Sequence, residues 1–317
     1  MHLLVTGGAG YIGAHLCALL RERNIPHAIF DNLSTGHAEQ VFQSPLIRGD
    51  ICDASAVAAA LASGPFTGVV NLAALATLPA CEAAPELCAN INVGGVSVLL
   101  SAMQKAGIQH FVQASSCAVY APSDAPLSET CPLGPESRYG QSKQAAEALL
   151  AQSGMAYIAL RLFNVAGAHA SLHIGECHEP ETHLLPLALA AALGKRDKLA
   201  LFGQDYPTPD GTAVRDYIHV CDVASAMLRS MEHLHSGGTS AALNLGSGVG
   251  VSVRQLLARV EAATGKDVPH TLAQRRPGDV PALVCDTSLM RQTLGFEPQY
   301  SAIDRIIVSA LQWHAKH

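Results

Sequence analysis

The chain has 317 residues, 49% of them hydrophobic and 5% aromatic, and a formal net charge of −6 at pH 7. This length allows a sizeable core in one large α/β unit or in two lobes. The 20 basic and 26 acidic residues leave no basic block for binding phosphates, so we expect neither a nucleic acid nor a membrane as partner. The N-terminus lacks the pattern of a secretory signal, and the apolar run at 184–193 is about half the length of a bilayer span. We therefore expect a cytoplasmic protein.

The first half of the chain alternates short apolar runs with helical patterns. Strands are predicted at 2–7, 27–31, 46–50, 68–74, 110–116 and 157–164, and helices at 11–23, 56–63, 85–106 and 139–153. Strands separated by helices of this kind imply right-handed crossovers and a parallel sheet with helices on both faces. We therefore predict an α/β fold, a Rossmann-type doubly wound parallel sheet, with residues 1–165 as its dinucleotide-binding domain.

From about residue 166 the pattern changes to long loops that are rich in His, Pro, Asp and Gly. These loops are predicted at 166–182, 203–215 and 272–282, and helices at 183–194, 222–235, 252–264 and 302–315. We interpret residues 166–317 as mainly a smaller, substrate-binding lobe, from which some segments return to the N-terminal domain.

A glycine-rich turn, VTGGAGYIG, directly follows the first predicted strand. Gly7, Gly10 and Gly13 recur at three-residue intervals, which is a GxxGxxG form of the dinucleotide turn. The first glycine permits the turn, the middle one lets the backbone approach a pyrophosphate, and the last lets the helix pack on the strand. The helix N-terminus adds N–H donors and a partial positive charge. The strand before and the helix after are the context that such a motif requires.

Acidic residues follow the next two predicted strands. Asp31 ends the second strand about 20 residues past the turn, where a carboxylate accepts hydrogen bonds from the adenosine ribose and repels a 2′-phosphate. NAD is therefore predicted rather than NADP. Asp50 and Ile51 end the third strand, where the adenine ring is expected to lie.

Tyr139 and Lys143 lie one helical turn apart, so they share a helix face. The segment ASSCAVY delivers Ser115 and Ser116 to the carboxyl edge of the sheet, where open α/β sheets bind ligands. This set suits the oxidation of a secondary alcohol, with Tyr139 as base, Ser116 bound to the same oxygen and Lys143 on the nicotinamide ribose. We expect the lysine and the nicotinamide charge to lower the pKa of the phenol from about 10 to about 7.

Motifs over nearly the whole chain resemble one family, the extended short-chain dehydrogenase/reductases, and most closely its UDP-glucose (UDP-galactose) 4-epimerases. The similar segments are TGGAGYIG, DNLSTG, SSCAVY, YGQSK, LRLFNVAGAH, FGQDYPTPDGTAVRDYIHV and RRPGDVPA. The resemblance implies a homodimeric isomerase with bound NAD as transient hydride acceptor. It would interconvert UDP-galactose and UDP-glucose through a 4-ketose. Epimerases of UDP-N-acetylglucosamine, a UDP-pentose or UDP-glucuronate stay open as alternatives.

The resemblance also implies contacts for individual residues. Catalytic roles fall to Ser116, Tyr139 and Lys143. Cofactor contacts are expected from Gly7, Gly10, Tyr11, Ile12, Gly13, Asp31, Asn32, Asp50, Ile51, Leu72, Ala73, Ala74, Asn92, Ser115, Tyr139, Lys143 and Phe163. Substrate contacts are expected from Ser116, Tyr139, Asn164, His183, Leu184, Leu201, Phe202, Arg215, Tyr217, Arg276 and Asp279. The two arginines suit a pyrophosphate, because a guanidinium binds phosphate oxygens bidentately.

Several positions depart from the family pattern. Asn71 stands where a histidine is common, and Ala76 where some members carry a lysine that touches the cofactor phosphates, so NAD is expected to be more exchangeable. Leu283 occupies a position whose size helps to decide whether an N-acetyl group fits, and leucine is intermediate. Ser116 is followed by Cys117, read as an apolar filler, and Ala118; the absence of a carboxylate here argues against a 4,6-dehydratase. The intact Ser-Tyr-Lys set argues against a catalytically silent NAD-binding regulator.

The chain contains nine cysteines and 15 histidines. The nine cysteines form no C-x-x-C pair, and reduced, mostly buried thiols are expected in a chain of this size. The segment HASLHIGECHEPETH at 169–183 holds four histidines whose spacing matches no standard ligand set. We therefore expect solvent-exposed loop histidines and no metal.

Overall fold

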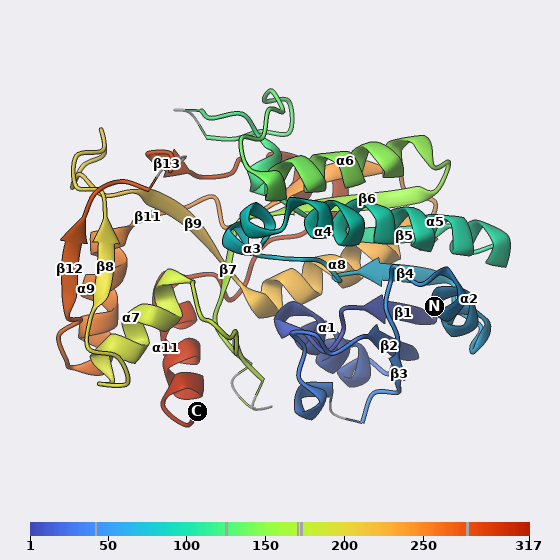
Figure 1. Cartoon of the computed structure of the whole chain (residues 1–317), viewed down its shortest axis with the longest axis horizontal. Coiled ribbons are helices and arrows are strands. Elements are labelled where there is room, and N and C mark those ends of the chain that lie inside the picture. The colour runs from blue at the N-terminus through green and yellow to red at the C-terminus, as the bar shows by residue number, and fades with distance from the viewer. Residues whose placement is uncertain (42, 124–125, 170, 172–173, 277–278) are drawn as a thin grey trace.

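The main sheet has seven parallel strands among the described residues, in the order β10-β6-β5-β4-β1-β2-β3. The computed structural model describes residues 1–41, 43–123, 126–169, 171, 174–276 and 279–317 (Figure 1). The strands are β1 (Leu3–Thr6), β2 (His27–Asp31), β3 (Leu46–Arg48), β4 (Gly68–Asn71), β5 (His110–Ser116), β6 (Ala156–Leu162) and β10 (Ala241–Leu245). Successive strands are added first on one side of β1 and then on the other, so the predicted doubly wound α/β class is confirmed.

Helices cover both faces of this sheet. One face carries α1 (Tyr11–Glu22), α8 (Val220–His235) and α10 (Ser288–Leu294), and the other carries α2 (Ala54–Ala62), α5 (Gly95–Ala106) and α6 (Arg138–Gln152). Successive side chains of a strand point to opposite faces, so Leu3 and Val5 lie in one core cluster while Leu4 lies in the other. Double coverage explains why these strands are continuous apolar runs instead of alternating ones.

The long helix predicted at 85–106 is confirmed as one helical run with a local irregularity. It consists of α4 (Pro85–Ala89), a π-helical segment η2 (Asn90–Gly94) and α5. By length and composition alone this run could cross a membrane. However, Val96, Leu99 and Met103 of α5 pack into the core of the main sheet. We therefore describe it as a core helix with one exposed side.

The second half of the chain builds two small sheets and a third core cluster at the end of the molecule opposite to the N-terminus (Figure 1). One sheet contains β7 (Asn164–Ala166), β9 (Val214–His219), β11 (Gly250–Ser252) and β13 (Ala282–Leu283), and the other pairs β8 (Leu199–Phe202) with β12 (His270–Ala273). The helices around them are α7 (Leu184–Ala192), α9 (Val253–Thr264) and α11 (Ile303–His314).

The sequence reading missed several elements. It described 166–317 as loops around isolated helices, whereas β8 to β13 lie there, and β9 and β12 begin or end inside segments predicted as loops. It also missed α10 and the short α3 (Leu78–Ala83). The missed strands have two to six residues, and β12 is mostly exposed, so they show neither length nor a clear alternation. The expectation that some segments return to the main sheet is met by β10.

Candidate active site

The glycine turn lies between the end of β1 and the start of α1. Gly7 has φ +70°, and a Cβ there would lie 2.5 Å from the backbone nitrogen of Ala73, so a larger residue would be excluded. A Cβ on Gly13 would collide with the carbonyl oxygen of Gly7, whereas one on Gly10 would meet only that oxygen, at 3.4 Å. Gly10 is the N-cap of α1 and offers no side-chain cap, which leaves the helix N–H groups to a ligand. This backbone cradle fits the pyrophosphate of a dinucleotide.

Carboxylates stand beside the turn, at the ends of β2 and β3. Asp31 is buried and accepts hydrogen bonds from the backbone nitrogens of Ala9, at 3.0 Å, and Leu33, at 2.8 Å. Asp50 accepts one from Asn32 at 2.9 Å, and the backbone N–H of Cys52 together with Asn32 holds its pKa below the usual range. The predicted ribose and adenine contacts therefore lie together at one edge of the sheet.

Asn92 joins the end of β4 to helix α6. Its Oδ1 accepts a hydrogen bond from Leu75 N at 2.7 Å, and its Nδ2 donates to Ser142 Oγ at 2.9 Å. Leu72, Ala73 and Ala74 lie in the segment that this contact secures. Asn92 is 3% exposed, and its contact with the cofactor stays a prediction.

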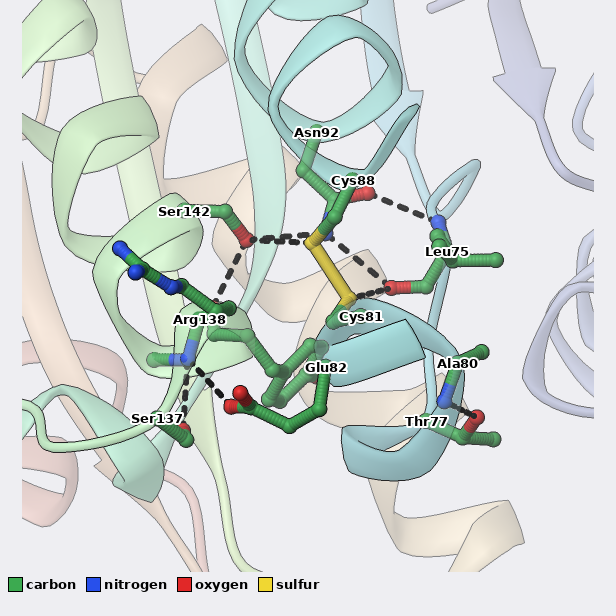
Figure 2. Close-up of a disulfide and its surroundings, with 12 residues drawn as sticks. Leu75, Thr77, Ala80, Cys81, Glu82, Cys88, Asn92, Ser137, Arg138 and Ser142 are labelled. Carbon is green, nitrogen blue, oxygen red and sulfur yellow. Dashed lines mark hydrogen bonds between the residues drawn. A yellow bond between two sulfur atoms is a disulfide. The ribbon is translucent and has the colours of Figure 1, made fainter. Parts of the chain in front are cut away.

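A disulfide joins Cys81 of α3 to Cys88 of α4, as Figure 2 shows. Both cysteines are buried, and Cys88 Sγ lies 3.5 Å from Asn92 Nδ2 and 3.6 Å from Ser142 Oγ. The expectation of reduced, mostly buried thiols is therefore wrong for this pair. It is also wrong for the exposed Cys177, while four other free cysteines are partly buried. Sequence spacing could not predict the pair, because a short turn between two helices brings the sulfurs together.

Ser116, Tyr139 and Lys143 are brought together as predicted. Ser116 ends β5 and lies near the phenol of Tyr139, in the first turn of α6, where it acts to lower the pKa of that phenol. Lys143 Nζ lies 5.6 Å from the centre of the Tyr139 ring and donates to the carbonyl oxygen of Ala114 at 2.9 Å. Lys143 is 4% exposed, and Tyr139 is partly exposed.

The acidity of these groups differs from the expectation. Burial raises the pKa of Tyr139 to about 12, against the hydrogen bond from Ser116, which lowers it. Burial lowers the pKa of Lys143 to about 8, against the charge of Glu147, which raises it. The expected phenol pKa of about 7 is therefore wrong for the chain by itself, since loss of hydration outweighs the favourable contacts.

A buried ion pair behind Lys143 was missed by the sequence reading. Glu147, one helical turn beyond Lys143, accepts hydrogen bonds from Ser115 Oγ at 2.5 Å and Arg161 Nη2 at 2.7 Å. Arg161 also donates to the hydroxyl of Tyr120 at 2.8 Å. The available signal was the i, i+4 continuation of the Tyr-Lys pair, which places Glu147 on the same helix face.

Asn71 and Ala76 have different surroundings. Asn71 is fully buried and accepts a hydrogen bond from Thr6 Oγ1 at 2.6 Å while it donates to Gln113 Oε1 at 2.9 Å. It is a satisfied polar group inside the sheet. Ala76 is exposed beyond the end of β4.

Phe163 is buried in a small cluster, against which Cys117 packs as expected of a filler.

The predicted substrate residues gather on β8, β9 and the segment before β13. Arg215 of β9 donates to the carbonyl oxygen of Val280 at 3.0 Å and pairs with Asp279 at 3.4 Å. The guanidinium of Arg276 lies 4.0 Å from the centre of the Phe202 ring. Pro277 and Gly278 of the RRPGDVPA motif lie outside the described residues. Four of the expected substrate residues thus form two contacting pairs.

The remaining predicted substrate residues lie on β7, β8 and β9 and at the start of α7. Asn164 donates from Nδ2 to the carbonyl oxygen of Asp216 at 2.9 Å. Leu201 and Tyr217 are buried in the third core cluster, so Leu201 can meet a ligand only through its backbone. His183 is the N-cap of α7, and Leu184 is its first residue. Leu283 of β13 is in register with Arg215.

The histidine-rich segment is less exposed than expected. The His178 side chain is 30% exposed, His169 21% and Glu176 4%, while His183 reaches 52%. Burial acts to raise the pKa of Glu176, but the nearby rings of His178 and His183 outweigh it and lower the pKa to about 2. His173 lies outside the described residues.

Comparison with known proteins agrees with this geometry. Residues 3–246 match the NAD dependent epimerase/dehydratase family. The chain belongs to this family. It is 44% identical to a UDP-glucose 4-epimerase of Rhizobium leguminosarum bv. trifolii, over 99% of this chain and 97% of the relative.

Two solved structures are similar over nearly the whole length. One is a UDP-glucose 4-epimerase from Brucella ovis in complex with NAD, with a TM-score of 0.95 and 41% identity over 98% of this chain and 97% of that one. The other is from Stenotrophomonas maltophila, with bound NAD and formylated UDP-arabinopyranose, with a TM-score of 0.95 and 36% identity over 100% and 98%. These three relatives are UDP-glucose 4-epimerases.

Proposed function

We propose that this chain is an isomerase, a 4-epimerase that interconverts UDP-galactose and UDP-glucose through a transient 4-ketose with NAD as cofactor. The observation that carries the proposal is the meeting of Ser116, Tyr139 and Lys143 at the carboxyl edge of the sheet that holds the glycine turn. Homology to UDP-glucose 4-epimerases over 99% of the chain supports the choice of substrate.

In this proposal Tyr139 takes the proton of the C4 hydroxyl and later returns it, while Ser116 hydrogen-bonds the same oxygen. NAD, when bound, supplies a hydride acceptor and a positive charge near the phenol. One ammonium at about 6 Å contributes roughly 2.8 kcal/mol at an effective dielectric constant of 20, or about two pKa units. Lys143 alone therefore does not bring the Tyr139 pKa from about 12 to neutrality, and a second positive charge has to act in the same direction.

Binding of the UDP-sugar is assigned to the second half of the chain. Arg215 and Arg276 carry the positive charge for the pyrophosphate, and Phe202 offers a ring face for the uracil. We divide the chain accordingly into an NAD-binding domain, residues 1–165, and a mainly UDP-sugar-binding lobe, residues 166–317, with α8 and β10 returning to the first. We assign to Leu283, in register with Arg215 on the neighbouring strand, a role in limiting the size of the sugar.

The same proposal includes a cytoplasmic homodimer without nucleic-acid or membrane partners. The helical run Pro85–Ala106 supports a protein interface, because it packs one side into the core and leaves apolar residues such as Leu87 exposed. Gel filtration with light scattering tests the dimer directly.

The function is tested by incubating the purified protein with UDP-galactose, with and without added NAD. UDP-glucose should form without net accumulation of NADH. Steady release of NADH would indicate a dehydrogenase, and inactivity on every sugar a binding protein. Parallel incubations with UDP-N-acetylgalactosamine and UDP-arabinose test the other sugars, and faster turnover of either would replace UDP-galactose in the proposal.

A further inference from the structure

Four metal-ligating side chains converge between β7 and α7, outside the proposed catalytic set. They are Glu176, His178, Glu181 and His183, and one ligand atom of each lies within 4.8 Å of all the others. Spacing along the chain gave no hint of this, because the turns of the segment bring the four together. We call them the His-Glu cluster.

Three separations within the His-Glu cluster lie within about 0.5 Å of those of a tetrahedral site, with Glu181 counted through either of its two carboxylate oxygens. A zinc ion with bonds of about 2.0–2.1 Å holds its ligand atoms roughly 3.3 Å apart. His178 Nδ1 lies 3.2 Å from Glu176 Oε1 and 3.8 Å from Glu181 Oε2, and His183 Nδ1 lies 3.5 Å from Glu181 Oε1. His183 Nδ1 and Glu176 Oε1 are hydrogen-bonded at 2.5 Å, so this pair would open by about 0.8 Å around an ion.

An unsatisfied nitrogen gives an independent reason to expect a ligand. His178 Nδ1 is buried and has no hydrogen-bond partner of acceptable geometry, although Glu176 Oε1 is near. Buried polar atoms are nearly always satisfied, so each exception requires an explanation. A cation between these two atoms would give the nitrogen a partner.

Charge and chemistry favour a divalent transition metal. Burial acts to lower the pKa of His183, but its contacts with Glu176 and Glu181 outweigh burial and raise the pKa to about 10, so a metal ion has to displace a proton from this ring. Two carboxylates and two neutral imidazoles then carry a net charge of −2, which one divalent cation neutralises. Two nitrogen and two oxygen ligands suit zinc better than the oxygen-seeking magnesium or calcium ions. The Glu176 carboxylate is 4% exposed and His183 52%, so the cluster is closed on one side and reachable from the other.

The backbone of the His-Glu cluster is anchored to distant parts of the chain. Trp313 Nε1 donates to the carbonyl oxygen of Glu176, and His37 Nε2 hydrogen-bonds that of Cys177, each at 2.9 Å. The ring of Tyr11, in the glycine turn, meets His178 edge-on at 6.2 Å. Such supports hold first ligands in place, as metal sites require.

We propose that Glu176, His178, Glu181 and His183 form a structural site for one zinc ion. The ion would hold together the turns of the segment that precedes α7. Since His183 and Leu184 begin α7 and are proposed substrate contacts, any effect on substrate binding rests on the proposed function; the metal site itself does not.

The test is metal binding by tag-free protein that has been stripped with a chelator. Calorimetry with Zn²⁺ and visible absorption with Co²⁺ should give one ion per chain, with the band intensity of four-coordinate cobalt. His178→Ala and Glu181→Gln should each weaken binding about 100-fold, and the double variant should abolish it. His270→Ala, at an exposed histidine elsewhere, is the matched control and should bind as the wild type does.

Absence of one-to-one binding in the wild type, or unchanged binding in the double variant, would overturn the proposal. X-ray absorption of the zinc-loaded wild type covers the case in which the double variant fails to fold. Two imidazoles around the ion support the site, and a shell without imidazole rejects it. These readouts do not depend on turnover, so they are distinct from failure of the epimerase assay.

Discussion

Two opposing effects act on the pKa of Tyr139. Its burial raises the pKa to about 12, and Ser116 acts against that rise through a hydrogen bond. Lys143 is buried and donates a hydrogen bond from its ammonium to the carbonyl oxygen of Ala114 in β5. The chain thus brings the proposed base and its proposed partner together but does not ionise the phenol by itself.

Replacing Tyr139 with phenylalanine removes the proposed base and keeps the ring. We expect Tyr139→Phe to bind NAD as the wild type does and to lose roughly 10²- to 10⁴-fold in kcat. NAD binding is measured by fluorescence titration, and turnover by the coupled UDP-galactose assay. Tyr300→Phe, at an exposed tyrosine, is the control. Full activity of Tyr139→Phe would remove the base from the mechanism.

The charge of Glu147 raises the pKa of Lys143, so we infer that Glu147 acts on the proposed site as a positioning residue. Glu147→Gln removes the charge that raises the Lys143 pKa above what burial alone would allow, so the alkaline limb of the kcat profile should move to lower pH. The variant should also lose roughly 3–5 kcal/mol of unfolding free energy, because Arg161 is left buried without its partner.

The double variant Glu147→Gln, Arg161→Met separates these two effects. It should recover part of the stability, because no unpaired charge stays buried, while the pH profile stays shifted. Chemical denaturation and pH-dependent kinetics measure the two quantities. An unshifted alkaline limb in both variants would mean that Glu147 has only a structural role.

At the level of elements, α6 depends on its neighbours for its position. Its Ser142 receives a hydrogen bond from Asn92 at 2.9 Å and lies next to the disulfide between α3 and α4 (Figure 2). The same helix carries Tyr139 and Lys143, so α3 and α4 support the helix of the proposed catalytic residues. The short α3 had no clear sequence signal, yet it completes this support.

Removing the disulfide tests that support. Cys81→Ser, Cys88→Ser should lower the free energy of unfolding by about 2 kcal/mol, because a crosslink over a short loop removes entropy from the unfolded chain. The wild type in dithiothreitol should show the same fall in Tm, and the double variant none. Cys177→Ser, at an exposed free thiol, is the control. Equal Tm values for the wild type with and without reductant would show that the thiols are not paired.

At the level of the whole molecule, two buried histidines link the halves of the chain and make stability depend on pH. Burial lowers the pKa of His15 in α1 to about 3, and that of His219, at the end of β9, to about 4. His219 hydrogen-bonds Ser309 of α11 at 3.0 Å. Both are neutral in the folded protein near neutral pH.

The sign of the pH effect follows from these lowered values. Between about pH 6.5 and 4 the unfolded chain binds protons that the folded chain does not, so the free energy of unfolding should fall as pH falls. Above pH 6.5 these two groups contribute no slope. Urea denaturation from pH 7 to 4.5 measures this, and His15→Gln should flatten the curve while the exposed His270→Gln should not. A slope unchanged in His15→Gln would contradict the assignment.

The sequence by itself determined the parts that depend on local pattern. Continuous apolar runs and the GxxGxxG turn were enough for the parallel sheet, and the i, i+4 spacing was enough to place Tyr139 beside Lys143. Turn and helix geometry act over a few residues, so they can be read along the chain. The site in the second half was found by family resemblance and not by periodicity.

The tertiary structure decided what depends on residues that are distant in sequence or on desolvation. The short strands β8 to β13 form only because partners far along the chain pair with them. The Glu147–Arg161 pair, the Cys81–Cys88 disulfide and the His-Glu cluster arise from contacts across turns and strands. The pKa of Tyr139 depends on how much water the fold removes, which no spacing along the chain can state.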